Sequence, residues 1–187
     1  MKTQANYLGL VLVLAAAMSS VVMAYSGGDG STASPYQISC AVDWQELMAR
    51  SGDWGKQFIV TADIDLAGVV VTTVGTNSTT FGGILDGGGH TIYRAVISQS
   101  GRDYAGLFGR IAAAGQVKNL GVAGGSVTGA NYCGGLAGEN RGTITGCYAT
   151  VPVTCSYYSG GLVGENRGTI TGCYATGDIT SSGRCIG

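Results

Sequence analysis

The chain of 187 residues is poor in charge, proline and histidine. Only 11% of its residues are charged, its formal net charge is −1, and it contains 2 prolines and 1 histidine. The absence of a basic balance argues against nucleic acid as a partner, because a basic patch is the usual footprint of nucleic-acid-binding proteins. Low charge combined with 45% hydrophobic residues also argues against intrinsic disorder. The length suits a single domain.

Familiar catalytic signatures are also missing. The sequence holds no His-Glu-x-x-His zinc-protease motif, no Gly-x-Ser-x-Gly nucleophile elbow and no phosphate-binding P-loop. It has no Cys-x-x-Cys pair, and a single histidine gives little material for a zinc site. We therefore expect no cofactor and no metal, and we expect the chain not to be an enzyme.

A single long hydrophobic run occurs, at residues 8–23. It follows Lys2 and ends in Val22-Met23-Ala24, which offers small residues for a cleavage site after Ala24. The alternative is an uncleaved membrane anchor, but the run is short for a span of about 20 residues. Residues 1–24 are therefore predicted to be a signal peptide. Because no second run of that length follows, we expect a secreted or cell-surface protein without a membrane span after signal removal.

Glycine is abundant, with 34 residues, and it punctuates a tandem repeat. Residues 132–150 and 158–176 are nearly the same string at an offset of 26 residues, differing only at Cys133/Ser159 and Ala137/Val163. A fixed period of this size is the signature of a repeat architecture. Each copy has short runs of β-branched and aromatic residues cut by glycines, a pattern typical of strands joined by tight turns.

Stacking identical units of this kind predicts an all-β fold, a right-handed parallel β-helix with one coil per repeat. Successive coils would then lie about 4.8 Å apart. Equivalent residues of the two copies would form ladders along the helix axis, namely Leu136 with Leu162, Ile144 with Ile170, and Cys147 with Cys173.

The repeat carries a family resemblance. The string Gly-Gly-Leu-Val-Gly-Glu-Asn followed by Gly-Thr-Ile-Thr-Gly-Cys-Tyr-Ala-Thr-Gly resembles the GLUG repeat of large secreted and surface bacterial proteins. The resemblance covers roughly residues 104–187, and the upstream stretch is similar to the segment that often precedes such repeats. Some proteins with this repeat carry a separate IgA-cleaving metallopeptidase domain, so the resemblance implies a surface repeat protein but names no activity.

Four segments follow from this pattern. After the signal peptide, residues 25–34 are expected to be a flexible lead-in, and residues 35–103 an N-terminal cap with the first coils. Residues 104–187 are expected to be repeats of about 26 residues, beginning with a degenerate copy at 104–120. Because residues 185–187 align with residues 159–161, the last repeat is incomplete, and we expect the chain to be a fragment of a longer protein.

The cap contains the one predicted helix, at residues 43–50. Asp43 is expected to be its N-cap, with Glu46 at the capping-box position. Trp44, Leu47 and Met48 would form its apolar face. Such a helix would close the N-terminal end of the β-helix, since terminal repeats need caps that shield the core.

Six cysteines in an exported chain suggest disulfides. Cys147 and Cys173 would lie one coil apart, but in-register side chains leave their Cβ atoms wider apart than the usual 3.8 Å or so, which favours two small core residues. Cys133 and Cys185 would lie two coils apart, too far to bond. Cys40 and Cys155 show no identifiable partner.

Candidate catalytic residues are Asp63, Asp65, Asp86 and His90. Paired carboxylates suit glycoside cleavage, and carboxylates with a hard cation suit polysaccharide lysis. The alternative is structural, because Asp86-Gly87-Gly88-Gly89 is also ordinary turn chemistry and His90 would then hydrogen-bond the turn.

Candidate binding residues lie in the repeats, and they are Glu139, Arg141, Glu165, Arg167, Tyr132 and Tyr158. The charged residues form either a polar binding strip or a solvated corner that prevents lateral aggregation. The tyrosines stack either as an exposed surface for sugars or protein, or as a half-buried support for the sheet.

These observations predict a non-enzymatic repeat segment that acts as a β-helical stalk or adhesin-like binding scaffold. A carbohydrate-active β-helix, either a lyase, a hydrolase or a sugar-binding module, is the first alternative. A non-catalytic arm of a surface metallopeptidase is the second. The expected partners are a host or matrix protein or a polysaccharide, and self-association through the open C-terminal coil is a further expectation.

Overall fold

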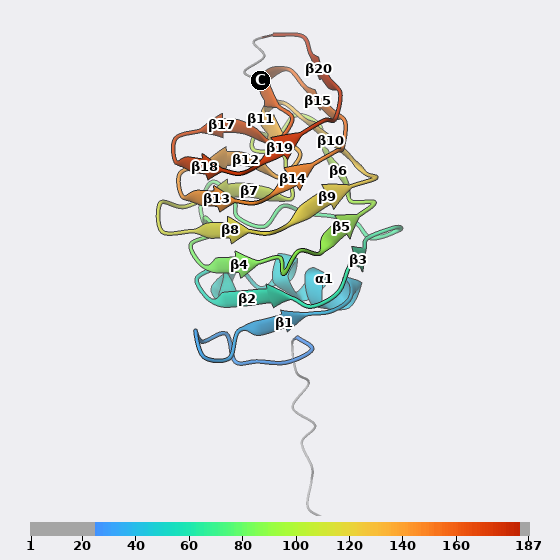
Figure 1. Ribbon diagram of the computed structural model, residues 1–187. Coiled ribbons are helices and arrows are strands. Elements are labelled where there is room, and N and C mark those ends of the chain that lie inside the picture. Colours follow the sequence, from blue (N-terminus) through green and yellow to red (C-terminus); the bar gives the residue numbers. More distant parts are fainter. Residues whose placement is uncertain (1–24, 184–187) are drawn as a thin grey trace, which may run out of the picture.

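The computed structural model describes residues 25–183, which form a right-handed parallel β-helix of about five turns (Figure 1). The N-terminal coil lies at the bottom of the view and each later coil is stacked on the one before it. The predicted signal peptide, its cleavage site after Ala24, and Cys185 lie outside the described residues. The predicted fold class is confirmed, including a single helix near the N-terminus.

The strands are short, and those at equivalent places in successive coils pair in parallel to form five sheets along the helix axis. The first sheet contains β1 (Tyr36–Ile38), β2 (Gln57–Val60), β4 (Ile84–Asp86), β8 (Gln116–Lys118), β13 (Thr143–Thr145) and β18 (Thr169–Thr171). The second contains β3 (Ile64–Asp65), β5 (Thr91–Tyr93), β9 (Gly121–Ala123), β14 (Tyr148–Ala149) and β19 (Tyr174–Ala175). The third contains β6 (Val96–Gln99), β10 (Ser126–Gly129), β15 (Val153–Cys155) and β20 (Ile179–Ser181). The remaining two contain β11 (Asn131–Gly134) with β16 (Tyr157–Gly160), and β7 (Phe108–Ile111), β12 (Ala137–Asn140) and β17 (Val163–Asn166).

The register between coils follows the repeat. Ile144 pairs with Ile170 across β13 and β18, an offset of 170 − 144 = 26 residues. The degenerate coil before it pairs Phe108 with Ala137, an offset of 29, and Val117 with Ile144, an offset of 27. Two extra residues therefore lie between β7 and β8, within the copy that the sequence identified as degenerate.

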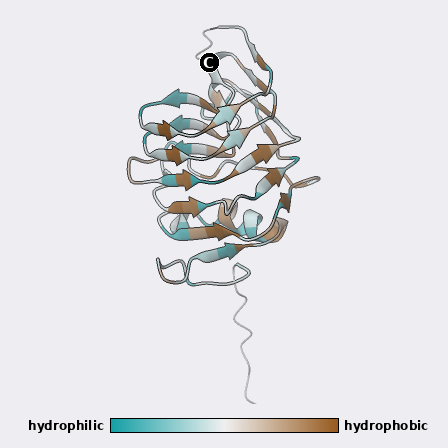
Figure 2. Ribbon diagram, viewed as in Figure 1, coloured by the Kyte–Doolittle hydropathy of each residue, from teal (hydrophilic) through white to brown (hydrophobic). Residues whose placement is uncertain are grey.

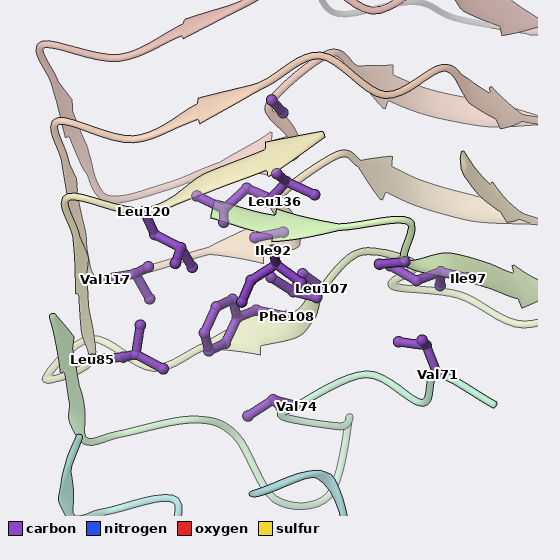
Figure 3. Close-up of a cluster of buried hydrophobic side chains, with 14 of the residues drawn as sticks. Val71, Val74, Leu85, Ile92, Ile97, Leu107, Phe108, Val117, Leu120 and Leu136 are labelled. Carbon is purple, nitrogen blue, oxygen red and sulfur yellow. The ribbon is translucent and has the colours of Figure 1, made fainter. Parts of the chain in front are cut away.

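The core is the line of inward-facing side chains along the axis of the coils. Strand β8 is an example, because Val117 is fully buried while Gln116 is exposed. Figure 3 shows such residues from different coils meeting inside the β-helix, among them Leu85, Val117, Leu120 and Leu136. Burial of apolar surface at about 25 cal/mol per Å² is the main force that holds such a stack together.

The first coil is completed by a helix instead of strands. α1 (Ala41–Ala49) follows β1 and leads into the short 3-10 helix η1 (Ser51–Asp53). Trp44 and Leu47 are fully buried, and the Trp44 ring contacts the Phe108 ring edge-on at 6.3 Å between centroids. The helix thus packs its apolar face against the core of the coils above it.

The prediction for the start of this helix was wrong. Cys40, not Asp43, is the N-cap, and its side chain makes no capping hydrogen bond to the helix. Asp43 lies in the first turn, where its carboxylate accepts the backbone N–H of Ser39 at 2.7 Å and the hydroxyl of Ser26. Glu46 pairs with Arg50 instead of closing a capping box. An acidic side chain in the first turn satisfies a free N–H and suits the positive end of the helix dipole, whichever residue is the cap.

The lead-in at residues 25–34 is packed against the first coil, in contrast to the flexible segment that its composition predicts. Gly27 and Gln37 form an antiparallel bridge. Tyr25 is buried, with its ring 4.4 Å from that of Tyr36 and 5.7 Å from that of Phe58. The buried Tyr25 ring and the backbone hydrogen bonds of Gly27 and Gly30 to the first coils together hold this segment in place.

Candidate functional site

The cysteines form one disulfide, which sequence reasoning missed. Cys133 on β11 bonds to Cys155 on β15, with Cα atoms 6.0 Å apart. A repeat offset relates only equivalent positions of successive coils, whereas this bond joins different sheets across a corner, 22 residues apart. Gly129 lies beside it, and a Cβ atom there would come within 2.9 Å of the Cys133 sulfur. In the next coil Ser159 and Ser181 take the places of both cysteines together, a paired change that hinted at the bond.

Cys147 and Cys173 are free and lie in the core ladder that begins with Leu120, as predicted. Cys147 is buried. Its burial, and to a smaller extent the neighbouring Cys173, raises the pKa of its thiol to about 12. Since the thiolate is the reactive form, Cys147 behaves as a small apolar core residue.

The candidate catalytic residues separate into pairs. Asp63 lies 3.3 Å from the His90 ring and also accepts the backbone N–H of Thr91 at 2.9 Å. Asp65 forms an exposed ion pair with Arg94, whose hydrogen bonds hold the pKa of the Asp65 carboxyl below its usual range. Both carboxylates thus connect β3 to the coil that follows it.

Asp86 lines a cavity of about 470 Å³ together with Gly88, Asn119 and Tyr148. Burial raises the pKa of Asp86, but hydrogen bonds from the Gly88 N–H, Asn119 and Lys118 outweigh it and hold the pKa below its usual value. No second carboxylate lines this cavity among the described residues, whereas glycoside cleavage ordinarily needs two. The arrangement therefore keeps Asp86 ionised, but no second carboxylic acid among the described residues faces it across the cavity.

The repeated charges form a compact cluster in the sheet of β7, β12 and β17. Arg110, Glu139 and Glu165 occupy the same register position in three successive coils. Glu139 is 1% exposed, and its carboxylate accepts hydrogen bonds from Arg110 on one side and Arg141 on the other. Burial raises the pKa of Glu139, but these two arginines outweigh it and hold the pKa below its usual value.

The outer part of this cluster faces solvent. Arg167 donates to Glu165 at 3.0 Å and also lies 3.7 Å from Glu139. The Arg141 and Arg167 side chains are 46% and 56% exposed. The cluster therefore combines a buried anion that joins the coils with two cations whose outer sides remain accessible. The buried Glu139 differs from the fully solvated corner that the sequence suggested, and the binding strip stays a prediction.

Three tyrosines form a stack beside this cluster. The rings of Tyr104 and Tyr132 are 4.9 Å apart, and those of Tyr132 and Tyr158 are 4.8 Å apart, nearly parallel in both pairs. The Arg110 guanidinium lies over the Tyr104 ring at 4.7 Å. Since Tyr132 is covered on both faces, it presents only its edge and hydroxyl to a partner. The sequence identified Tyr132 and Tyr158 but omitted Tyr104 from this set.

All three tyrosines have left-handed backbone geometry, with φ of 63°, 58° and 54°. A bulky residue with positive φ is unusual and costs about 1–2 kcal/mol relative to the right-handed region. Glycine would remove that cost, so the stacked side chains must contribute enough to offset it. A second ladder, Tyr148 over Tyr174 with rings 5.2 Å apart, has ordinary geometry, and the Tyr148 hydroxyl hydrogen-bonds that of Thr91.

Residues 25–183 contain neither a candidate metal cluster nor a membrane-spanning helix. No group of three or more histidine, cysteine or acidic side chains is placed to hold a metal ion in this part of the chain. Over the same range, no helix has the length and apolar character required to cross a membrane.

Comparisons with known proteins agree with this architecture. The chain is 34% identical over 139 residues to halomucin of Haloquadratum walsbyi, an alignment that covers 68% of this chain and 2% of halomucin. It is 32% identical over 153 residues to a Gly-rich membrane protein of Evansella cellulosilytica, covering 75% of this chain and 18% of that protein. The chain thus spans less than a fifth of either relative.

A solved structure shares the fold. The crystal structure of a protein from Bacteroides ovatus described as an immunoglobulin A1 protease superposes with a TM-score of 0.69, covering 85% of this chain and 50% of that one. At 24% identity this likeness shows the fold alone. A family model described as the GLUG motif matches residues 156–180. The resemblance of the repeats is therefore confirmed, and the chain carries a GLUG motif in a parallel β-helix.

Proposed function

We propose that the chain is a non-enzymatic repeat segment of a secreted or cell-surface protein, serving as a β-helical stalk or adhesin-like scaffold. The observation that carries the proposal is the way the repeated polar residues are used. The Glu139 carboxylate is buried between arginines, and the Tyr132 ring is covered on both faces. Repeated residues engaged in coil-to-coil contacts suit a structural element of indefinite length.

Surface location is part of this proposal. It is supported by the names of the two relatives, a halomucin and a membrane protein, and by the predicted signal peptide. Labelling intact cells with an antibody against residues 25–183 tests it, since an internal protein would be labelled only after the cells are lysed.

We assign the partner-facing surface to the exposed sides of Arg141 and Arg167. Two guanidinium groups one coil apart match acidic groups spaced along an extended partner, such as a host or matrix protein or a polysaccharide. Beads coated with the protein are expected to adhere to a surface that carries an acidic matrix protein or an acidic polysaccharide. The double variant R141A/R167A is expected to lose most of that adhesion. R94A, which removes an arginine from a different sheet, is the matched control and should adhere like wild type.

Self-association through the last described coil belongs to the same proposal. Leu162 and Ile170 are only half-buried there and line a cavity of about 470 Å³ with Tyr174. Sedimentation over a range of protein concentrations is expected to show reversible association, and a single monomer species at all concentrations would contradict it.

A carbohydrate-active function is the second candidate, favoured by the cavity at Asp86. Release of reducing ends or unsaturated uronates from a polysaccharide, abolished in D86N but retained in D63N, would establish it and remove the scaffold proposal. An arm of a surface peptidase is compatible with the scaffold role and with the described name of the Bacteroides ovatus structure. A zinc-protease motif elsewhere in the same open reading frame would decide for it.

A further inference from the structure

A crevice of about 480 Å³ opens mainly in the part of the molecule before the repeats. Two of its lining residues, Asn77 and Tyr104, contact Arg110 of the charged cluster. Two loops form its walls, one at residues 72–77 and the other at residues 99–104, next to β6. Its remaining lining comes from Met48 of α1 and from Trp54. The volume falls in the range of about 300–1,000 Å³ that is usual for small-molecule sites.

Fixed groups hold the walls of the crevice in place. The backbone N–H of Thr72 donates to the Met48 sulfur at 3.3 Å. The Trp54 ring N–H donates to the carbonyl of Leu47 at 2.8 Å, so the indole is oriented by the helix. Asn131 donates to the Asp103 carboxylate at 2.7 Å, and Arg110 donates to the side-chain oxygen of Asn77. These contacts form a largely prearranged site, which lowers the ordering cost of binding.

Hydrogen-bonding groups that remain available line the same crevice, on the exposed loop that holds Arg102 and Asp103. Within residues 25–183 the Arg102 guanidinium and the Gln99 side-chain amide make no side-chain hydrogen bond or ion pair, and both line the crevice. The second oxygen of Asp103 also has no partner there. Donors from Arg102 and an acceptor from Asp103 on adjacent residues can hold two neighbouring hydroxyl groups of one ligand.

The apolar part of the lining is a floor formed by Met48, Trp54 and Tyr104. Trp54 is 4% exposed, so only a small part of its indole borders the crevice. A ligand that presents C–H groups on one side and hydroxyl groups around its rim fits this combination, and a pyranose ring has that form. Because the charges of Arg102 and Asp103 cancel, the site has no net preference for an anion or a cation.

We infer that this crevice binds a neutral saccharide of one or two units, with Arg102, Gln99 and Asp103 recognising its hydroxyl groups over the Met48–Trp54 floor. The site is built entirely from residues outside the repeated strings. Its existence does not depend on the scaffold proposal, since an adhesin-like surface at Arg141 and Arg167 operates on a different part of the molecule.

The test uses the full chain and a defined set of probes, namely D-galactose, D-mannose, N-acetyl-D-glucosamine, D-glucuronate and triglycine. Saturation-transfer NMR is expected to show transfer to at least one neutral sugar, followed by titration calorimetry for its affinity. R102A and Q99A are each expected to weaken binding about tenfold, the usual effect of removing a hydrogen bond that involves a charged or buried polar group. R94A is the control and should bind like wild type with an unchanged melting temperature.

Several results would overturn the inference. If none of the three neutral sugars receives saturation transfer, the crevice is not a saccharide site. If a sugar binds R102A and Q99A with the same affinity as wild type, it binds outside the crevice. Tighter binding of D-glucuronate or of triglycine than of any neutral sugar would assign the crevice to an anion or a peptide. Normal sugar binding in R141A/R167A, by contrast, would support a site that does not use those two arginines.

Discussion

The two halves of this β-helix solve the same packing problem with different side chains. Residues 25–103 fill their coils with large aromatic rings, among them Trp44, Phe58 and Phe81, and close the end with α1. The repeats at 104–183 use small inward residues such as Ala137 and Cys147, and add polar ladders between coils. Figure 2 shows the consequence, with more hydrophobic strands β2 and β4 at the bottom than β12 and β17 above.

The two halves therefore differ in how often each contact recurs. The ring contacts of the cap, such as Trp44 with Phe108, occur once, whereas the repeats make the same pairing, such as Ile144 with Ile170, from coil to coil. The buried Glu139, which differs from the solvent-accessible Glu165, shows that even identical residues take different roles according to their coil.

Removing the central ring of the cap should have the largest effect. Trp44→Ala leaves a cavity under Phe108 and is expected to cost about 3–5 kcal/mol of the free energy of unfolding. Val42→Ala on the exposed side of the same helix should cost less than about 0.5 kcal/mol. Urea denaturation of both variants checks this. Equal losses would show that the helix does not close the core.

The charged cluster offers a comparison between two coils. Glu139→Gln leaves the Arg110 guanidinium, only 11% exposed, without a full counter-charge, and is expected to cost about 3 kcal/mol. Glu165→Gln alters a more exposed pair and should cost less than about 1 kcal/mol. Thermal denaturation of the two variants measures the difference, and a larger loss in Glu165→Gln would contradict the assigned roles.

The disulfide should stabilise the corner between β11 and β15. Replacing both Cys133 and Cys155 with serine, as the next coil does naturally, opens a loop of 22 residues and is expected to cost about 3 kcal/mol. Cys40→Ser removes an exposed free thiol and serves as the control. If the double variant melts like wild type, serine at these positions supports the corner as well as the bond does.

The strained tyrosines separate backbone from side-chain effects. Tyr132→Ala loses two stacked contacts and keeps the left-handed backbone, whereas Tyr132→Gly loses the same contacts and removes the strain. The alanine variant is therefore expected to be less stable than the glycine variant by about 1 kcal/mol. A glycine variant more stable than wild type would mean that the stack contributes less than the cost of the left-handed backbone, which would contradict the stabilising role assigned to it.

The smallest effect concerns acidity. The pKa values of Glu139 and Asp43 are lowered by folding, so both contribute stability that is complete above their unfolded pKa values of about 4.3 and 3.9. That stability is lost as the pH falls through the lower folded values. Unfolding free energies measured between pH 6 and pH 2 should fall, and the slope should be shallower in Glu139→Gln; an unchanged slope would contradict the shift at Glu139.

Much of the fold was determined by the sequence alone. The 26-residue offset specified the register of Ile144 with Ile170, because a period of that length can close into one coil and in-register stacking buries the same side chains each time. The two-residue excess before Val117 located the additional loop. The apolar spacing of Trp44 and Leu47 identified the face of the capping helix, since i and i+3 positions lie on one side.

Contacts across corners became visible only in the folded chain. Cys133 and Cys155, and the two loops of the crevice, come together because the chain turns between sheets, and a repeat offset predicts contacts only between equivalent positions of successive coils. Glu139 is likewise buried because strands β7 and β17 lie on either side of it. Its local sequence does not predict this burial, since Glu165 has nearly the same local sequence and is more exposed. The sequence thus determined the register between coils, because the repeat offset is read directly from it. The tertiary structure determined which side chains are buried, because burial depends on the neighbouring coils.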